Sequence, residues 1–307
     1  MATGHFFKSS ADVGAPSLRN VAGDLIALLD WALDVATGTY WQKVYSGTNK
    51  AVYRATTGQR MYLRVDDTGT TQANVRGYTT MSDVDTGTLA FPTVANSPTV
   101  FFYKSNAAAA RDWRIVGDSR FFLLTAQPNN NTIAETFKLA FGECTPYDPL
   151  DAYLSICWAS SATASQYNTN TGTLLSLPTD FSSSASNAMG IANNMAGSAP
   201  SRVCSIKTNA WVNGGPSNPP FANAAVIAMR PVEVFDMGTL TSSVAEALIR
   251  GTIPYLYACP CTLDTSATPY NVDLTIGAST FRPYQGTSSN SGPLTLIRTS
   301  NDEPGRV

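Results

Sequence analysis

KAVYRATTGQRMYLRVDDTGTTQANVRGY, residues Lys50 to Tyr78, is the stretch that decides the fold class of this chain. It contains three short strand candidates, Lys50–Ala55, Arg60–Asp66 and Gln72–Tyr78, separated by the turn-forming sequences TTGQ and DTGTT. Apolar residues occupy alternate positions of the middle candidate, which is the pattern of a strand with one buried face. Because short loops join antiparallel neighbours, the stretch predicts a β-meander.

Strand-like segments continue along most of the chain. They are rich in aromatic and β-branched residues and are bounded by Gly, Asp, Asn and Pro. In chain order they are Thr99–Ser105, Asp112–Ser119, Arg120–Ala126, Thr136–Cys144, Asp151–Ala159, Arg202–Thr208, Asn223–Phe235 and Pro254–Cys261, followed by two in the tail, within DLTIGASTFRPYQG and SGPLTLIRTS. We therefore predict a mainly β protein, an antiparallel β-sandwich or barrel-like meander.

Two helices interrupt the β pattern. An N-terminal helix is predicted over Pro16–Asp34, where apolar residues recur at positions i, i+3, i+4 and i+7. Gly23 costs such a helix about 1 kcal/mol relative to alanine, which indicates either close packing there or a break after one turn. In the C-terminal half, Ser243–Glu246 matches a capping box and predicts one short helix that ends at Arg250-Gly251.

These elements suggest two parts. Residues 1–40 are predicted to form an N-terminal arm and helix, and residues 41–307 a β-rich domain. Within the second part, residues 160–201 are polar, small and nearly uncharged. A structureless loop of that length is unusual inside a compact domain, so we interpret it as an insertion that lies over a neighbouring surface; disorder is the alternative.

Charged residues are scarce in this chain. They make up 14% of the 307 residues, and the formal net charge is −2, whereas ordinary soluble domains have roughly 25% charged residues. Nucleic-acid binding needs a basic patch, so it is not expected. A surface rich in hydroxyl and amide groups suits a subunit that packs against copies of itself or other subunits, and it also suits a secreted β protein.

The sequence shows no sign of membrane insertion. Its N-terminus, MATGHFFKSSADVGAPS, has neither a basic nor an apolar segment of the kind that signal peptides carry, so no signal peptide is expected. The longest apolar runs, such as Ala224–Met229, fall far short of the roughly 20 residues that a membrane helix requires.

The residue types that dominate enzyme active sites are sparse. His5 is the single histidine, which leaves little basis for Ser-His-Asp or Cys-His catalysis. The five cysteines are expected to be reduced, and the Cys259-Pro-Cys261 spacing fits neither redox nor zinc motifs. Phosphate-binding, dinucleotide-binding and metalloprotease motifs are also absent. We assign no catalytic, cofactor-binding or metal-binding residue, and we expect neither a cofactor nor enzymatic activity; carboxylates paired for sugar hydrolysis remain a minor alternative.

Two acidic turns carry the most suggestive cluster. Asp66 and Asp67 follow one strand candidate, and Asp83 and Asp85 follow the next. Aspartates in such positions bond the backbone of their own turn and need no other function. Turns at alternate ends of a meander would lie about 20 Å apart, so the two turns would share a calcium ion only if both fell at one end. The ordinary-turn interpretation is preferred, with the calcium site as the alternative.

Several segments resemble a known family. They are Gly14–Leu33, Tyr45–Gly69, Val75–Thr93, Asp112–Ala126 and Ile249–Pro260. Together they resemble a family of tailed-bacteriophage virion structural proteins, over about residues 1–160 and 245–300. The resemblance implies a non-enzymatic virion component, made in the host bacterial cytoplasm, that contacts copies of itself and other virion proteins.

The resemblance does not fix a position on the particle. A neck or tail component of the collar, hub or baseplate type is preferred, with a capsid decoration or minor head protein as the alternative. A glycan- or receptor-binding tail module is a further alternative. It rests on four aromatic residues that an exposed binding platform would use: Trp113, Trp158, Trp211 and Tyr270.

Overall fold

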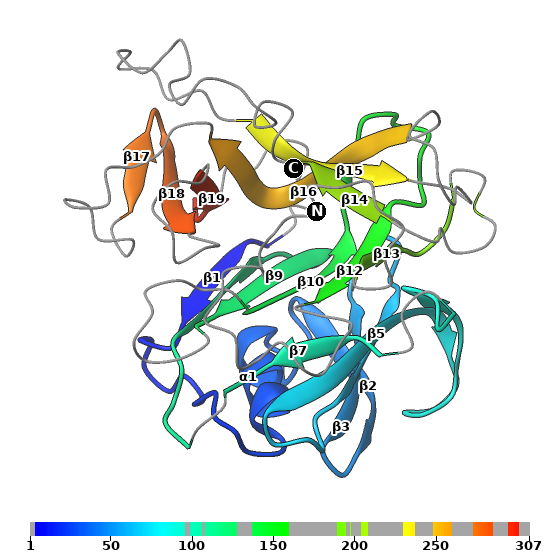
Figure 1. The fold of residues 1–307 in the computed structure, drawn as a ribbon, viewed down its shortest axis with the longest axis vertical. Helices are drawn as coiled ribbons and strands as arrows, with labels where there is room; N and C mark the ends of the chain where they lie inside the picture. The colour runs from blue at the N-terminus through cyan, green and yellow to red at the C-terminus, as the bar shows by residue number, and fades with distance from the viewer. Residues whose placement is uncertain are drawn as a thin grey trace.

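The computed structural model describes residues 4–95, 99–105, 108–127, 137–159, 189–194, 197, 204–207, 230–236, 248–259, 273–284 and 294–300. These residues form three antiparallel β-sheets and one α-helix. The predicted mainly β class is therefore confirmed. Figure 1 shows the sheets as three layers, with the first sheet of this description at the bottom, the middle sheet in the centre and the third sheet at the top.

The first sheet contains the meander that the opening stretch predicts. Its strands lie in the order β2-β3-β4-β5-β6, and β7 also pairs with β5. Their bounds are β2 Trp41–Gly47, β3 Lys50–Ala55, β4 Tyr62–Asp66, β5 Gln72–Met81, β6 Gly87–Phe91 and β7 Phe101–Tyr103. The three predicted strands between residues 50 and 78 are confirmed, whereas β2 and β6 lie outside the predicted segments.

The middle sheet has the order β1-β8-β9-β10-β12-β13. Its strands are β1 Phe6–Ser9, β8 Trp113–Gly117, β9 Phe121–Ala126, β10 Phe137–Glu143, β12 Ser155–Ala159 and β13 Met189–Ile191. The predicted strand segments Asp112–Ser119, Arg120–Ala126, Thr136–Cys144 and Asp151–Ala159 thus contribute to this middle sheet and not to the first. All six residues of β9 are buried, which requires a covering layer on each face of this sheet.

The third sheet has the order β14-β15-β16-β19-β18-β17, and the short strand β11 pairs with β16. The bounds are β11 Thr145–Pro146, β14 Cys204–Lys207, β15 Arg230–Asp236, β16 Leu248–Cys259, β17 Leu274–Ile276, β18 Ser279–Tyr284 and β19 Leu294–Arg298. The predicted helix end at Arg250-Gly251 is wrong, because both residues belong to β16; residues 243–247 lie outside the described residues. The tail contributes three strands rather than two.

Helix α1, Asp24–Ala32, is shorter than predicted. It starts directly after Gly23, whose φ of 89° is a left-handed conformation that glycine adopts without strain. Residues 16–22 are not helical. Gly23 therefore marks the beginning of the helix and not a packed position inside it.

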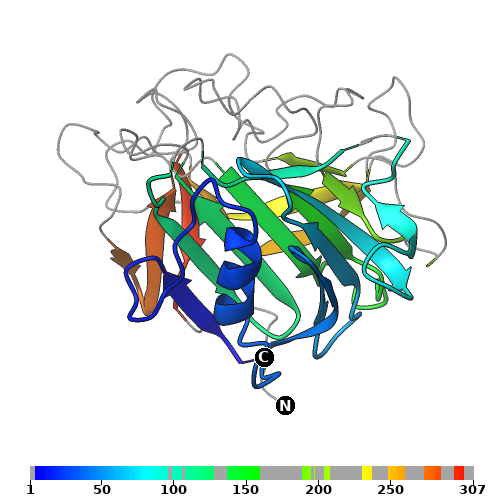
Figure 2. The same cartoon turned by 90° about the horizontal axis from the view of Figure 1, so that it is seen from below.

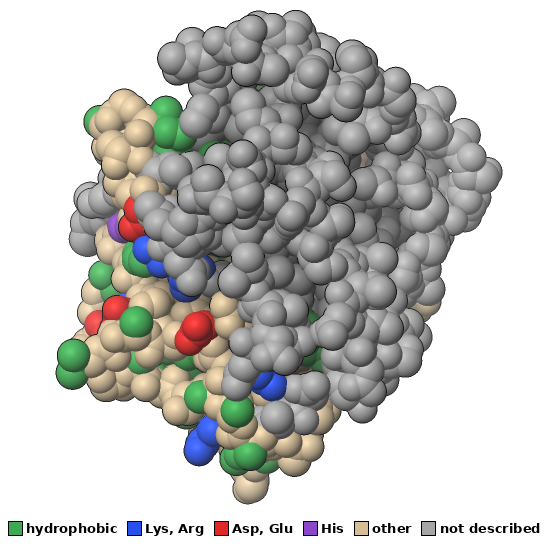
Figure 3. Space-filling view, turned by 60° about the vertical axis from the view of Figure 1, so that its left-hand side comes forward, with side chains coloured by type: hydrophobic (Ala, Val, Ile, Leu, Met, Phe, Trp, Pro, Cys, Tyr) green, Lys and Arg blue, Asp and Glu red, His purple; other side chains and the backbone are tan. Residues whose placement is uncertain are grey.

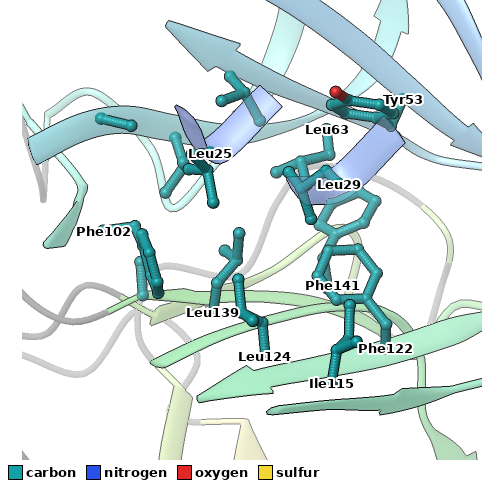
Figure 4. Close-up of a cluster of buried hydrophobic side chains, with 14 of the residues drawn as sticks. Leu25, Leu29, Tyr53, Leu63, Phe102, Ile115, Phe122, Leu124, Leu139 and Phe141 are labelled. Carbon is teal, nitrogen blue, oxygen red and sulfur yellow. The ribbon is translucent and has the colours of Figure 1, made fainter. Parts of the chain in front are cut away.

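Two hydrophobic cores separate the three layers. The first lies between the first sheet and the middle sheet and includes α1. Figure 4 shows Leu25 and Leu29 of α1 lying between Leu63 of the first sheet and side chains of the middle sheet. The second core lies between the middle and third sheets. Neighbouring residues of β9 point into different cores, Leu123 into the second and Leu124 into the first.

The predicted division near residue 40 does not coincide with a break in packing. Strand β1 belongs to the middle sheet, and α1 shares the first core with Trp41. Of the predicted insertion at residues 160–201, the structure describes 189–194 and 197, and there β13 pairs with β12. The remainder of that prediction lies outside the described residues.

Candidate functional site

The two acidic turns converge on one ionic cluster, against the expectation that they lie far apart. Lys50 Nζ lies 3.7 Å from Asp66 Oδ2 and 2.9 Å from Asp85 Oδ2. Arg64 pairs with the same two carboxylates and donates from Nε to the Val84 carbonyl at 2.9 Å. The turn between β5 and β6 therefore folds back over the solvent-facing side of the first sheet.

This cluster balances its own charge. The Arg64 and Lys50 side chains hold the pKa of Asp85 below its usual value. Burial alone would raise the pKa of Asp66, but hydrogen bonds from Thr68 and pairing with Arg64 lower it overall. Two cationic side chains thus occupy the place that a calcium ion would take, which favours the ordinary-turn interpretation. Within the described ranges, no group of three or more His, Cys, Asp or Glu residues is arranged to hold a metal ion.

Asp67, unlike the neighbouring Asp66, has no solvent exposure. Its carboxylate pairs with the equally buried Lys104 and accepts the backbone N–H of Leu25 at 2.8 Å. Lys104 also donates to the carbonyls of Val21 at 2.6 Å and Gly69 at 2.8 Å. Burial raises the pKa of Asp67, and the Lys104 pair opposes that rise. The pair therefore fixes the start of α1 to the first sheet, which is a structural role.

His5, Cys144 and Cys157, the histidine and cysteine side chains that the structure describes, occupy structural positions. The ring of His5 lies 5.5 Å from that of Tyr255, and the Tyr255 hydroxyl donates to Asp118 Oδ2 at 2.8 Å. Burial raises the pKa of the Cys157 thiol to about 12, so this cysteine is protonated at neutral pH and is a poor nucleophile. Cys144 is also a buried free thiol.

Two of the four aromatics proposed for a binding platform are buried, so that expectation is wrong for them. Trp113 is fully buried in the first core, and Trp158 is 5% exposed in the second. Lys138 lies with its Nζ 4.3 Å from the Trp158 ring centroid, and burial lowers the pKa of this lysine to about 7. Trp211 and Tyr270 lie outside the described residues.

One end of the molecule joins turns of the first and middle sheets with one residue of the third, and we call it the turn face. It comprises the β3–β4 turn (residues 56–61), the β8–β9 turn (118–120), the β10–β12 loop (144–154) and Ile249. Thr57 Oγ1 lies 2.6 Å from Ser119 Oγ, and Ser155 Oγ lies 2.6 Å from Gln59 Oε1. In Figure 2 this end lies along the lower edge of the view.

The β10–β12 loop within the turn face is held rigidly. Asp148 Oδ1 accepts the N–H of Leu150 at 2.9 Å, and Asp151 Oδ1 accepts that of Tyr153 at 3.2 Å. The Asp151 carboxylate also receives two hydrogen bonds from Arg250, at 2.8 and 2.7 Å, and both side chains are buried. A bidentate, buried pair of this kind fixes both distance and orientation.

This rigid loop presents apolar side chains to solvent. Leu150 is 85% exposed and Tyr147 is 56% exposed, and Tyr153 and Ile249 are also exposed. Single exposed apolar residues are common, but several on one ordered surface mark a site of interaction. Tyrosine in particular gives large contact area at low entropic cost, and it is enriched at protein interfaces.

Charged residues flank the apolar part of the turn face. Arg54 and Arg60 lie at the β3–β4 turn, and in the described part of the chain neither forms an ion pair with a carboxylate; Arg54 donates to the Arg60 carbonyl, and Arg60 to that of Ala55. Asp148 and Glu233 lie on the other side, where the Tyr147 hydroxyl donates to Glu233 Oε1 at 3.3 Å and where Lys207 of β14 is the cross-strand neighbour of Glu233. On the face drawn in Figure 3, the charged side chains of the described residues stand singly or in small groups.

Sequence reasoning missed this surface. It assigned Asp151–Ala159 to one strand, whereas β12 starts at Ser155 and the preceding residues form the loop. The signal available was PYDPLDAY, residues Pro146–Tyr153, in which prolines and aspartates that favour turns are interleaved with apolar residues. Such a pattern indicates a turn, but it does not say which side chains reach solvent.

No protein-family model matches this chain, and no curated protein sequence matches it. In the part of the chain that the structure describes, no helix is long and apolar enough to cross a membrane.

Proposed function

We propose that this chain is a non-enzymatic structural subunit of a tailed-phage virion, a neck or tail component that assembles through subunit contacts. The observation that carries the proposal is the turn face, where a rigid loop holds Tyr147, Leu150 and Tyr153 in solvent. An assembly subunit gains from such rigidity because little conformational entropy is lost when the contact forms.

The composition supports the same role. Charged residues form only 14% of the chain, and depletion of charge is a property of the buried centres of interfaces. The resemblance of two segments, Tyr45–Gly69 and Val75–Thr93, to phage structural proteins supports a phage virion as the particle. These segments form most of the first sheet, where Asp66 and Asp85 form ion pairs with Lys50 and Arg64.

Quantitative mass spectrometry of purified particles from the phage that encodes this chain tests the proposal. A neck or tail component is expected in the small number of copies per particle that form one ring. The alternative, a capsid decoration or minor head protein, is expected in hundreds of copies. If the chain is missing from washed, intact particles, the virion proposal is wrong. Density for the chain in an image reconstruction then fixes the position.

A glycan-binding module is the second candidate, because Tyr147 and Tyr153 are exposed on one loop. The aliphatic side chains beside them, Leu150 and Ile249, favour a protein partner over a sugar, since carbohydrate rings need hydrogen-bonding groups around an aromatic surface. Glycan-array binding by the purified chain, lost on Tyr147→Ala with Tyr153→Ala, would support this candidate; a clean negative would count against it.

A further inference from the structure

We propose that the outer face of the first sheet, the face turned away from the first core, binds an acidic saccharide at Arg54 and Arg60. By acidic saccharide we mean a sugar whose ring carries a carboxylate. Such a ligand goes beyond the proposed function, and its site does not include the exposed β10–β12 loop on which that function rests.

One row of side chains crosses this outer face. Tyr53 and Leu63 point into the first core, so their neighbours Arg54 in β3 and Tyr62 in β4 point the other way. The registers of the first four strands place four residues directly opposite one another, and we call them the outer row: Gln42, Arg54, Tyr62 and Tyr78. All four are at least partly exposed to solvent.

Arg54 and Arg60 carry charges that no carboxylate of the chain neutralises. Arg54 Nε donates to the Arg60 carbonyl at 2.8 Å, and Arg60 Nε donates to the Ala55 carbonyl at 3.3 Å. The terminal nitrogens of both arginines have no protein partner in the described part of the chain. Two guanidinium groups tied to one hairpin repel each other, so an anion beside them would be stabilised.

Arg60 is held in a conformation that arginine rarely adopts. Its φ of 54° lies in the left-handed region, where the Cβ of an ordinary residue is crowded and glycine is not. Glycine does occupy position 58 of the same turn, with a φ of 71°. A side chain kept at a strained position indicates a role for that side chain. Here the side chain supplies the second unpaired guanidinium group.

Aromatic and amide groups lie beside the two charges. The Arg54 guanidinium carbon is 4.6 Å from the centroid of the Tyr62 ring, and this cation–π contact fixes the guanidinium plane. The Tyr78 ring lies against Gly87, where an added Cβ would come within 2.6 Å of it. Among the described residues, the Tyr62 and Tyr78 hydroxyls and the Gln42 amide have no hydrogen-bond partner. The outer row therefore offers rings, donors and acceptors next to a positive charge.

A saccharide with a carboxylate fits this combination. A sugar ring has an apolar C–H face that packs on aromatic rings, and its hydroxyls need donors and acceptors, which the outer row supplies. A carboxylate matches the fork of a guanidinium group, which binds it through two parallel hydrogen bonds. A nucleic acid would need a wider basic surface, whereas Arg64, on the same face, is already neutralised by Asp66 and Asp85.

An array of acidic glycans, probed with the purified full-length chain, tests the ligand class. The array carries oligogalacturonides, oligoglucuronides and sialyllactose, each beside its methyl ester, which keeps the rings and removes the charge. We expect at least one acidic glycan to bind at least about tenfold more tightly than its ester, with an affinity that falls as salt is added. An array on which no acidic glycan exceeds its ester would overturn the inference. So would equal binding of a hexaglutamate peptide, which would mean that the site recognises charge alone.

Variants of the hairpin test the position of the site. Arg60→Gly removes the guanidinium group and relieves the backbone strain, so the variant should fold at least as stably as the wild type while its affinity falls by at least about tenfold. Arg54→Gln and Tyr78→Leu should also weaken binding. Arg282→Gln removes the same charge from the third sheet, so it is the matched control and should bind like the wild type. Unfolding midpoints establish that every variant is folded.

The outcomes separate this site from the proposed function. A folded Arg60→Gly variant that binds like the wild type, or an equal loss in Arg282→Gln, would overturn the site. Loss of binding on Tyr147→Ala with Tyr153→Ala would place the glycan on the exposed loop instead. The Arg60→Gly chain should still enter particles if the virion proposal is right, because its exposed loop is unchanged. A wild type that binds acidic glycans but is absent from particles leaves the site established and removes the virion role.

Discussion

Lys104 and Asp67 form an ion pair with no solvent exposure on either side chain. The pair joins three places that are distant in sequence: the turn after β4, the residues after β7, and the first turn of α1, where Asp67 accepts the N–H of Leu25. The lysine has three oxygen acceptors, so its ammonium group is fully hydrogen-bonded. A carboxylate at a helix N-terminus is also stabilised by the helix dipole.

Removing one partner of this pair should destabilise the protein strongly. Lys104→Met leaves Asp67 buried without its cation, and we expect a loss of about 3–5 kcal/mol in the free energy of unfolding, measured by urea denaturation. The double variant Lys104→Met with Asp67→Asn should lose less than Lys104→Met alone, because Asn keeps an acceptor for Leu25 and carries no charge. Equal losses in the single and double variants would contradict this account.

The substitution Gly23→Ala distinguishes a glycine at the beginning of α1 from a glycine packed inside a helix. Inside a helix the change would stabilise the protein, whereas at a φ of 89° it should destabilise the fold by about 1–2 kcal/mol. The new Cβ would also lie 2.8 Å from Asn49 Oδ1. Urea denaturation gives the sign directly. Ala27→Gly, at an exposed position within α1, is the control and should cost about 1 kcal/mol.

The ionic cluster of the first sheet should make stability fall in acid. The pKa values of Asp66 and Asp85 are lowered in the folded state. Their contribution is therefore complete above the unfolded value of about 3.9, and it is lost as the pH falls through the lower folded values. Wild type should exceed the Asp66→Asn, Asp85→Asn double variant in unfolding free energy at pH 7, and the difference should shrink by pH 3. A difference that stays constant over this range would show that ionisation of these two carboxylates does not stabilise the fold.

The conformation of the β10–β12 loop should depend on Arg250. Arg250→Met leaves the Asp151 and Asp236 carboxylates buried without this cation, so we expect a loss of about 3–5 kcal/mol in unfolding free energy. Cleavage within residues 147–153 in limited proteolysis should also become faster. Arg282→Met, which breaks a more exposed pair with Asp273, is the control and should cost at most about 1 kcal/mol. Comparable losses in the two variants would mean that burial of the Arg250 pair is unimportant.

Local patterns in the sequence were sufficient to predict much of the secondary structure. Alternation in Lys50–Tyr78 predicted β3, β4 and β5 because a strand with one buried face needs apolar residues at every second position. The helix end predicted from the capping-box pattern is wrong, since Arg250 and Gly251 lie in β16; Ser243–Glu246 themselves lie outside the described residues. Short patterns of this kind do not register the pairing of β16 with β15 and β19, which overrides local preference.

What the sequence by itself determined is the class of the protein: mainly β, poor in charge, and nearly without histidine. Only the tertiary structure decided where chemically similar residues lie. Asp66 and Asp67 are neighbours in sequence, yet one serves a partly exposed ionic cluster and the other is buried beneath a helix. The exposure of Leu150 was equally undecided, because an apolar residue in a turn is buried or exposed according to how distant segments such as Arg250 hold the loop. Sequence periodicity shows which side chains share one face of a strand or helix, whereas contacts between layers decide what packs against that face.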